Sequence, residues 1–351
     1  MQKKLFALAV ATVASASAMA QSNVTIYGVA DAGVATGSAG ANKFSGVATG
    51  LLASSRLGFK GVEDLGNGLK AVFTYEFGTL QIDTGGNNNN GIASTRQSFV
   101  GLSNRLGTLT LGRQYAPGYM YAVKYNAYPG SIISPQYILA ATGGNTIGSV
   151  NDARWDNAVK YATPTINGFG GELIYGLGGK GKTAGDETSA QRGEDNNIGL
   201  GLNYANGNLA VGYVFHRLGA VAGNTNEHYL GATYDFGMVK LSGSIQKKQS
   251  DNPGVVDNKI YQVGAVVPVS AAGNVHFSYG TLNPDGGDNN AQAATLAYTH
   301  GFSKRTTGYI GWLYNKNDNG GAANAGTVPG LAIAPAGDNG NLLAIGMNHK
   351  F

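Results

Sequence analysis

The sequence predicts an all-β protein, a 16-stranded antiparallel transmembrane β-barrel. Three observations carry this prediction: the composition, a period-two alternation over long segments, and connections that alternate between short and long. The 351 residues include 56 glycines, 19 tyrosines and no cysteine. Glycine is unfavourable inside helices, so this composition points to strands and turns.

Residues 1–20 have the features of a secretory signal peptide. Lys3 and Lys4 precede an apolar run, and a small-residue segment ends in Ala18-Met19-Ala20, which fits an A-x-A cleavage site. We expect one mature domain, residues 21–351, a transmembrane β-barrel, because no linker divides it. Its 22 basic and 20 acidic groups nearly balance without a basic run, which argues against a nucleic-acid partner.

Apolar and polar residues alternate through residues 69–77, where Leu69, Phe73 and Phe77 share one face and Lys70 and Glu76 the other. Most such segments have 9–12 residues, the length of tilted membrane-spanning strands. The sixteen candidate strands are Val24–Val34, Ala53–Val62, Leu69–Phe77, Ala93–Ser103, Thr108–Gln114, Asn157–Thr163, Phe169–Leu177, Asn196–Ala205, Asn208–Arg217, His228–Phe236, Met238–Lys248, Asn258–Pro268, Gly273–Leu282, Ala291–His300, Thr306–Tyr314 and Asn341–Phe351.

The connections between these segments alternate in length. Short turns recur, and longer loops rich in glycine and asparagine lie between them, such as "TGSAGANKFSGVATG" at residues 36–50. Outer-membrane barrels have short periplasmic turns and long outer loops, and a sheet in hydrocarbon must close because lipid offers no backbone partners. Sixteen strands enclose a lumen too wide for side chains to fill. The pattern therefore predicts an aqueous channel lined by the polar alternates.

Five segments carry a family resemblance: "SNVTIYGVADAGV", "SRLGFKGVEDLGNGLKAVFTYEFG", "RQSFVGLSNRLGTLTLGRQYAP", "RWDNAVKYATP" and the terminal "NLLAIGMNHKF". They resemble the general porins of Gram-negative, beta-proteobacterial outer membranes. The resemblance implies an outer-membrane homotrimer whose barrel contains an infolded constriction loop. It also implies contacts with outer-membrane lipid and lipopolysaccharide, and recognition of Phe351 by the outer-membrane assembly machinery.

The longest connection, Tyr115–Ala153, is too apolar and aromatic to be only a solvated loop. The resemblance implies that it packs inside the barrel, and an outer lid or a subunit contact remains the alternative. Related porins often present carboxylates on this loop. Here it carries one base, Lys124, and a single acid, Asp152.

The strands on the other side of the lumen are expected to present basic residues. Arg56 and Lys60 point inward because Leu57 takes the lipid face, and Arg96 points inward if Phe99 points outward.

Arg154 shares its face with Asp156 and Lys160 if Val159 meets lipid. At ~3.3 Å per residue and ~40° tilt, Arg56, Arg96 and Arg154 lie about 20–28 Å from the short turns, at comparable heights. The resemblance implies that they form the basic ladder of a constriction. Three separately solvated arginines remain the alternative.

Inward acids are fewer, with Asp31 and Glu76 as the main candidates for the constriction. Arg113 shares parity with Leu109 and Leu111 and is expected at the rim or a subunit interface. Guanidinium groups stay charged and bind carboxylate or phosphate in a fork. The expected balance favours small anions.

The sequence thus predicts a passive diffusion channel for small hydrophilic solutes and ions with a mild anion preference, and not an enzyme. A substrate-specific channel for a sugar or an aromatic or organic acid is the alternative, since Tyr119, Tyr121, Tyr125 and Tyr128 could form an aromatic track. An outer-membrane barrel hydrolase is less favoured because the five histidines are scattered. No cofactor is expected, apart from weak Ca²⁺ binding in outer loops.

Overall fold

The computed structural model describes residues 23–78, 95–149, 153–178, 195–287, 290–318 and 337–351. The expected signal peptide and Asp152 lie outside these residues. The described part contains two helices, α2 (Pro117–Lys124) and α3 (Pro135–Thr142). Its strands are β1 (Asn23–Ala39), β2 (Asn42–Thr49), β3 (Arg56–Gly66), β4 (Leu69–Gly78), β5 (Thr95–Asn104), β6 (Gly107–Tyr115), β7 (Arg154–Ala162), β8 (Phe169–Gly176), β9 (Asn197–Asn206), β10 (Leu209–Leu218), β11 (Thr225–Asp235), β12 (Lys240–Ser250), β13 (Asn258–Pro268), β14 (Gly273–Pro284), β15 (Ala291–Gly301), β16 (Thr306–Asn317) and β17 (Gly340–Lys350).

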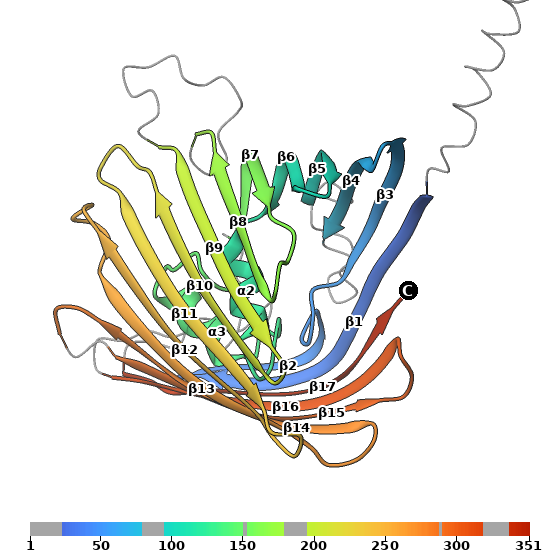
Figure 1. The fold of residues 1–351 in the computed structure, drawn as a ribbon. Coiled ribbons are helices and arrows are strands. Elements are labelled where there is room, and N and C mark those ends of the chain that lie inside the picture. Colours follow the sequence, from blue (N-terminus) through green and yellow to red (C-terminus); the bar gives the residue numbers. More distant parts are fainter. Residues whose placement is uncertain (1–22, 79–94, 150–152, 179–194, 288–289, 319–336) are drawn as a thin grey trace, which may run out of the picture.

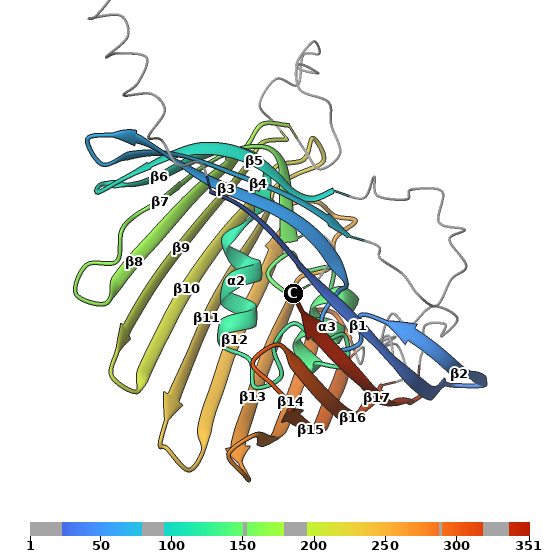
Figure 2. The same ribbon diagram turned by 90° about the vertical axis from the view of Figure 1, so that its right-hand side faces the viewer.

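The strands form one antiparallel sheet that closes into a barrel (Figures 1 and 2). Closure is made by β1, which pairs with β17 from Val29↔Lys350 to Ala39↔Gly340. On its other side, β1 pairs first with β3 and then with β2. Because β2 and β3 share one position beside β1, seventeen strands fill sixteen positions of the barrel wall, which confirms the predicted fold.

The segment at residues 36–50 is a β-hairpin, and its assignment to a loop from sequence was wrong. Strand β1 continues to Ala39, which pairs with Asn42 of β2. Gly40 takes a φ of 59° in the turn, a conformation that glycine adopts without steric cost. After Thr49 the second wall position is interrupted at residues 50–55 and resumes at Arg56. We call residues 50–55 the elbow.

Each face of the wall meets a different environment. Outward positions are large and apolar, as at Leu230, Ile245 and Val263, which are 50%, 52% and 56% exposed. Inward neighbours are polar or glycine, as at Glu227 and Gly231, except where they belong to a buried apolar cluster, as Leu313 does. No helix in the described residues is both long and apolar enough to cross a bilayer.

Residues 116–149 and 153, here called the constriction loop, lie inside the barrel, where α2 and α3 are seen against the inner wall (Figure 2). Helix α2 lies against β9–β11, and α3 against β13–β15. Gly212 makes room for this packing, since a Cβ there would meet the ring of Tyr125. Further along, Ile133 and Leu139 are fully buried in an apolar cluster with wall residues such as Leu313. The prediction of an infolded loop is therefore confirmed.

Candidate constriction site

Two arginines of the inner wall meet at one tyrosine. The Tyr115 hydroxyl accepts hydrogen bonds from Nη2 of Arg96 and from Nη2 of Arg154, each at 2.6 Å. The Arg154 guanidinium carbon also lies 4.4 Å from the Tyr115 ring centroid, and Tyr119 stacks on Tyr115 with centroids 4.0 Å apart. A cation over an aromatic face is attracted by the ring. Two like charges are thus held side by side by a neutral group.

One carboxylate takes part in this arrangement. Glu76 Oε1 accepts from Arg96 Nε at 2.6 Å, and Oε2 accepts from the Tyr27 hydroxyl at 3.0 Å. The Arg96 and Glu76 side chains are 11% and 5% exposed. Charge-assisted bonds of this kind are about twice as strong as neutral ones. Glu76 therefore fixes Arg96 and offsets one positive charge, while Arg154 has no contact with it.

The Arg96 side chain points into the lumen as expected, but for a different structural reason. Phe99 points inward, because it pairs with Thr74 and lines a hollow of about 340 Å³ in the inner wall, whereas Val100 is 51% exposed on the outer face. Simple alternation would then turn Arg96 outward. The register shifts beside Glu76, which leaves Arg96 as an extra residue in β5. This β-bulge re-aims the side chain into the lumen.

A second irregularity places Arg154. Gly112 pairs with Ala158 but Gln114 pairs with Trp155, so β7 has one extra residue at this level. Asp156 does not share the inward face as expected from alternation. It lies with Arg113, 2.6 Å from Oδ1 to Nη1. Arg113 thus pairs on the other side of the wall, while Arg154 is 7% exposed and points to Tyr115.

Arg56 and Lys60 lie on β3, next to this group. Arg56 Nε donates to Ser54 O of the elbow at 3.1 Å, and its side chain is half-buried. Lys60 is exposed, with Nζ 5.3 Å from the Tyr27 ring centroid. On β7, Lys160 forms an ion pair with Glu172 and donates to Tyr115 O at 3.2 Å. We call β3–β7 the arginine wall.

Asp31 does not line the passage, contrary to expectation, because it is 1% exposed. Its carboxylate accepts from Ala53 N at 3.1 Å, from the Tyr309 hydroxyl at 2.9 Å and from Asn348 Nδ2 at 2.8 Å. These partners belong to the elbow, β16 and β17. Leu51 O of the elbow accepts in turn from Ser131 Oγ of the constriction loop at 2.8 Å. Asp31 therefore joins the closing seam of the barrel to the loop.

The constriction loop brings no carboxylate among its described residues, 116–149 and 153, to face the arginine wall. Lys124 is exposed at the end of α2, with Nζ 5.5 Å from the Tyr125 ring centroid. Burial raises the pKa of Tyr125 to about 12, so this hydroxyl adds no negative charge. Tyr121, Tyr125 and Tyr128 are 6%, 1% and 1% exposed. They pack the loop against the wall and do not form an aromatic track.

Buried polar residues of β10–β13 hold the loop from the other side. Glu227, fully buried on β11, accepts from Thr146 N at 2.8 Å and from Ile147 N at 3.1 Å. His216 Nε2 accepts from Gly118 N at 3.1 Å, so its proton lies on Nδ1, which donates to Thr146 Oγ1 at 2.9 Å. Lys248 Nζ donates to the carbonyl of residue 143. We call β9–β15 the loop wall.

Tyr115 and Tyr27 were missed as members of the site. Tyr115 ends β6 at the parity of the outward Leu109 and Leu111, so alternation directs it away from the lumen. Tyr27 has inward parity, opposite to that of the exposed Ile26, on the strand next to Arg56, and this is the one signal that could have found it. No group of three or more histidine, aspartate or glutamate side chains that could hold a metal ion occurs in the described part. The loops considered for weak Ca²⁺ binding lie partly outside it.

Comparisons with known proteins agree with this geometry. The family model of the Gram-negative porins matches residues 7–320. Outer membrane porin protein 32 of Delftia acidovorans is 34% identical over 362 residues, covering 100% of both chains. The major outer membrane protein P.IB of Neisseria gonorrhoeae is 29% identical and covers 89% of this chain and 94% of its own.

Among solved structures, the anion-selective porin from Comamonas acidovorans matches with a TM-score of 0.77 and 31% identity, over 94% of this chain and 100% of its own. The fold, the infolded loop and the family match agree along nearly the whole chain. The chain is therefore a member of the Gram-negative porin family, a porin of the outer membrane.

Proposed function

We propose that the chain is a passive diffusion channel for small hydrophilic solutes and ions with a mild preference for anions. The observation that carries this proposal is the pair Arg96 and Arg154 at Tyr115, with one carboxylate beside it and none on the described part of the loop. Fixed charge on a low-dielectric wall focuses its field across the aqueous passage. The anion selectivity of the Comamonas porin supports this direction.

The test is the reversal potential in a dilute KCl gradient across a planar bilayer. We expect anion preference in the wild type and a shift toward the cation side when Arg56, Arg96 and Arg154 are all replaced by serine. The control removes three basic residues from short turns, Arg105, Lys304 and Arg305, which are exposed at the periplasmic end. Equal shifts in the two triple variants would contradict the assignment.

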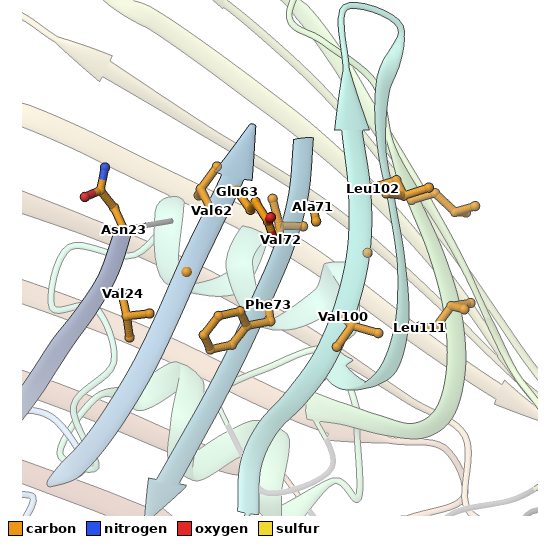
Figure 3. A pocket seen from close by; sticks show the side chains of 13 residues that line it. Asn23, Val24, Val62, Glu63, Ala71, Val72, Phe73, Val100, Leu102 and Leu111 are labelled. Atoms are coloured by element: carbon orange, nitrogen blue, oxygen red, sulfur yellow. The ribbon is translucent and has the colours of Figure 1, made fainter. Parts of the chain in front are cut away.

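A homotrimer is the assembly that we propose. An outward groove of about 420 Å³ runs across β1 and β3–β6, and Figure 3 shows Val24, Phe73 and Val100 on it. Its floor includes Gly101, and a concave apolar face can seat a ridge of a second copy.

Assembly is tested by unboiled gels and analytical ultracentrifugation. We expect an SDS-resistant trimer that becomes monomeric on boiling, and a folded monomer for Val100→Arg. Val263→Arg is the control, because Val263 is similarly exposed (56% against 51%) but lies on β13, outside the groove. A trimer that tolerates both changes equally would overturn the proposed contact.

The terminal Phe351 supports a role in assembly. Its backbone pairs with Gly28, and its ring is 47% exposed on the closing seam. We expect Phe351→Ala to lower the yield of folded protein in the outer membrane, measured as the heat-shifted band. Weak Ca²⁺ binding by outer loops stays a prediction.

A further inference from the structure

A row of basic side chains crosses the outer face of the barrel at the long-loop end of β11–β13. The strand register aligns His228 with Lys247, and Lys247 with Lys259. These positions share the outward face with Leu230, Ile245 and Val263, which are 50%, 52% and 56% exposed. Lys247 is exposed, and the Lys259 side chain is 44% exposed. The two ammonium groups therefore lie on the lipid side of the wall.

This arrangement carries an electrostatic cost in the isolated chain. Like charges directly opposite each other on neighbouring strands are destabilising, because their Cβ atoms are only about 4.5–5.5 Å apart. Among the described residues, this row forms one ion pair, a long one of 3.8 Å from Lys259 Nζ to Asp285 Oδ1. Lys247 makes no ion pair within that part of the chain. A shared anion between Lys247 and Lys259 would remove the repulsion.

The position of the row along the barrel axis shows where the lysines lie relative to the membrane. Along β13 the outward residues after Lys259 are Tyr261, Val263, Ala265 and finally Val267, which is 38% exposed near the short-turn end. Eight residues at ~3.3 Å each and ~40° tilt span about 20 Å, close to the apolar band of an outer-membrane barrel. The lysines thus lie at the outer edge of this band, at headgroup level.

Neighbouring aromatic groups support an interfacial position. The Tyr213 hydroxyl lies 2.8 Å from His228 Nδ1, and the Phe215 ring centroid is 5.1 Å from that of His228. Aromatic side chains with one apolar and one polar end favour the membrane interface. Arg217 follows Phe215 on the same face of β10, where the register places it opposite Asn226, and it is exposed, which adds a third cation at the long-loop end. The cations and the apolar surface next to them match a ligand that has both an anionic group and an apolar part.

We propose that the cluster of Arg217, Lys247 and Lys259 is a binding site for the phosphorylated headgroup of an outer-leaflet lipid, with the phosphate between the two lysines and the acyl chains on Leu230, Ile245 and Val263. The inference rests on the outer-membrane location of the porin but not on its ion selectivity. Lysine binds phosphate as a compact point charge. A free phosphate would use the lysines but not the apolar band.

The test uses the full-length porin in detergent micelles doped with diphosphoryl lipid A, with retained lipid measured by native mass spectrometry. We expect Lys247→Ser with Lys259→Ser to weaken binding at least tenfold. The matched control, Lys304→Ser with Arg305→Ser, also removes two neighbouring charges, but from the short turn after β15, and should bind as the wild type does. Both variants should keep the heat-shifted band of a folded barrel.

Two further probes separate the sources of phosphate. Lipid A stripped of its phosphates should bind weakly to every variant, and millimolar inorganic phosphate should not displace the intact lipid. Unchanged binding by the double lysine variant, equal binding of the stripped lipid, or displacement by inorganic phosphate would each overturn the proposal. The reversal potential of the double lysine variant should equal that of the wild type. A failure here is thus distinguishable from a failure of the proposed channel function.

Discussion

The arginine wall and the loop wall follow the same alternation of inward and outward residues, yet their inward charges have different roles. On the arginine wall, Arg56 and Lys60 remain accessible to water, and Arg96 is fixed by Glu76. On the loop wall, Glu227 and His216 are fully buried and bond to the backbone of the constriction loop. What covers a wall therefore decides whether its charges act on a solute or hold the loop.

This contrast gives the loop a defined position. Buried polar groups are costly unless they are hydrogen-bonded, so Glu227 and His216 favour the one placement of the loop that satisfies them. Asp31 adds a third attachment through the elbow. The passage is thus narrowed from a side whose charges are already paired, and the field within it comes from the arginines opposite.

The largest expected effect comes from removing the carboxylate of the loop wall. Glu227→Ala leaves the buried N–H groups of Thr146 and Ile147 without an acceptor. At about 1–3 kcal/mol for each unsatisfied group, the free energy of unfolding should fall by about 2–6 kcal/mol. Urea unfolding in micelles measures it, and single-channel current should become more variable as the loop loosens.

Asp251→Ala is the control for this change, because Asp251 is exposed in the loop after β12 and lies outside the proposed trimer contact. Exposed substitutions usually change stability by at most about 0.5 kcal/mol. If Glu227→Ala unfolds at the same urea concentration as Asp251→Ala, with unchanged current noise, the loop wall does not hold the loop in the way described.

A smaller effect is expected from adding a side chain to the wall where α2 and Tyr125 pack. Gly212→Val places a branched side chain where the Tyr125 ring lies against the wall. Overpacking typically costs about 1–3 kcal/mol, and relief requires the loop to move into the passage. Single-channel conductance should fall. Gly243→Val on β12 is the control, since the nearest atom to a Cβ there is Gln262 O at 3.7 Å. Equal conductance in both variants would show that the passage does not depend on this contact.

The sequence predicted the barrel well because long alternation and loop length are properties of many residues together. The directions of individual side chains were harder to predict. Arg96 was expected inward on the premise that Phe99 faces lipid, and the conclusion held only because a bulge offsets the inward Phe99. A bulge adds one residue to one strand, and the local alternation of apolar and polar residues does not predict where this happens. The same cause reversed Asp156.

Other features of the site depend on contacts between distant segments. Asp31 has the parity of a lumen residue, but the elbow that buries it joins β2 to β3, and β2 was hidden in a glycine-rich segment. The shared hydroxyl of Tyr115 requires Arg96 and Arg154, 58 positions apart in the chain, to meet. Alternation predicts which residues share a face, but it does not predict which of them touch.

The smallest expected effect separates charge from its arrangement on the arginine wall. Tyr115→Phe removes the hydroxyl that Arg96 and Arg154 share, while both charges and the stacked ring stay. If fixed charge sets selectivity, the reversal potential should remain on the anion side and move far less than in the triple arginine variant. Salt screens both charges, with a Debye length of ~30 Å in 0.01 M salt and ~3 Å in 1 M salt. Any difference from the wild type should therefore be clearest in dilute salt and fade as the salt concentration rises. Tyr175→Phe, which removes a hydroxyl bonded to Asn196 on the outer face, should behave as the wild type throughout. A full loss of anion preference in dilute salt for Tyr115→Phe would mean that the placement of the two guanidinium groups, and not their charge, governs permeation.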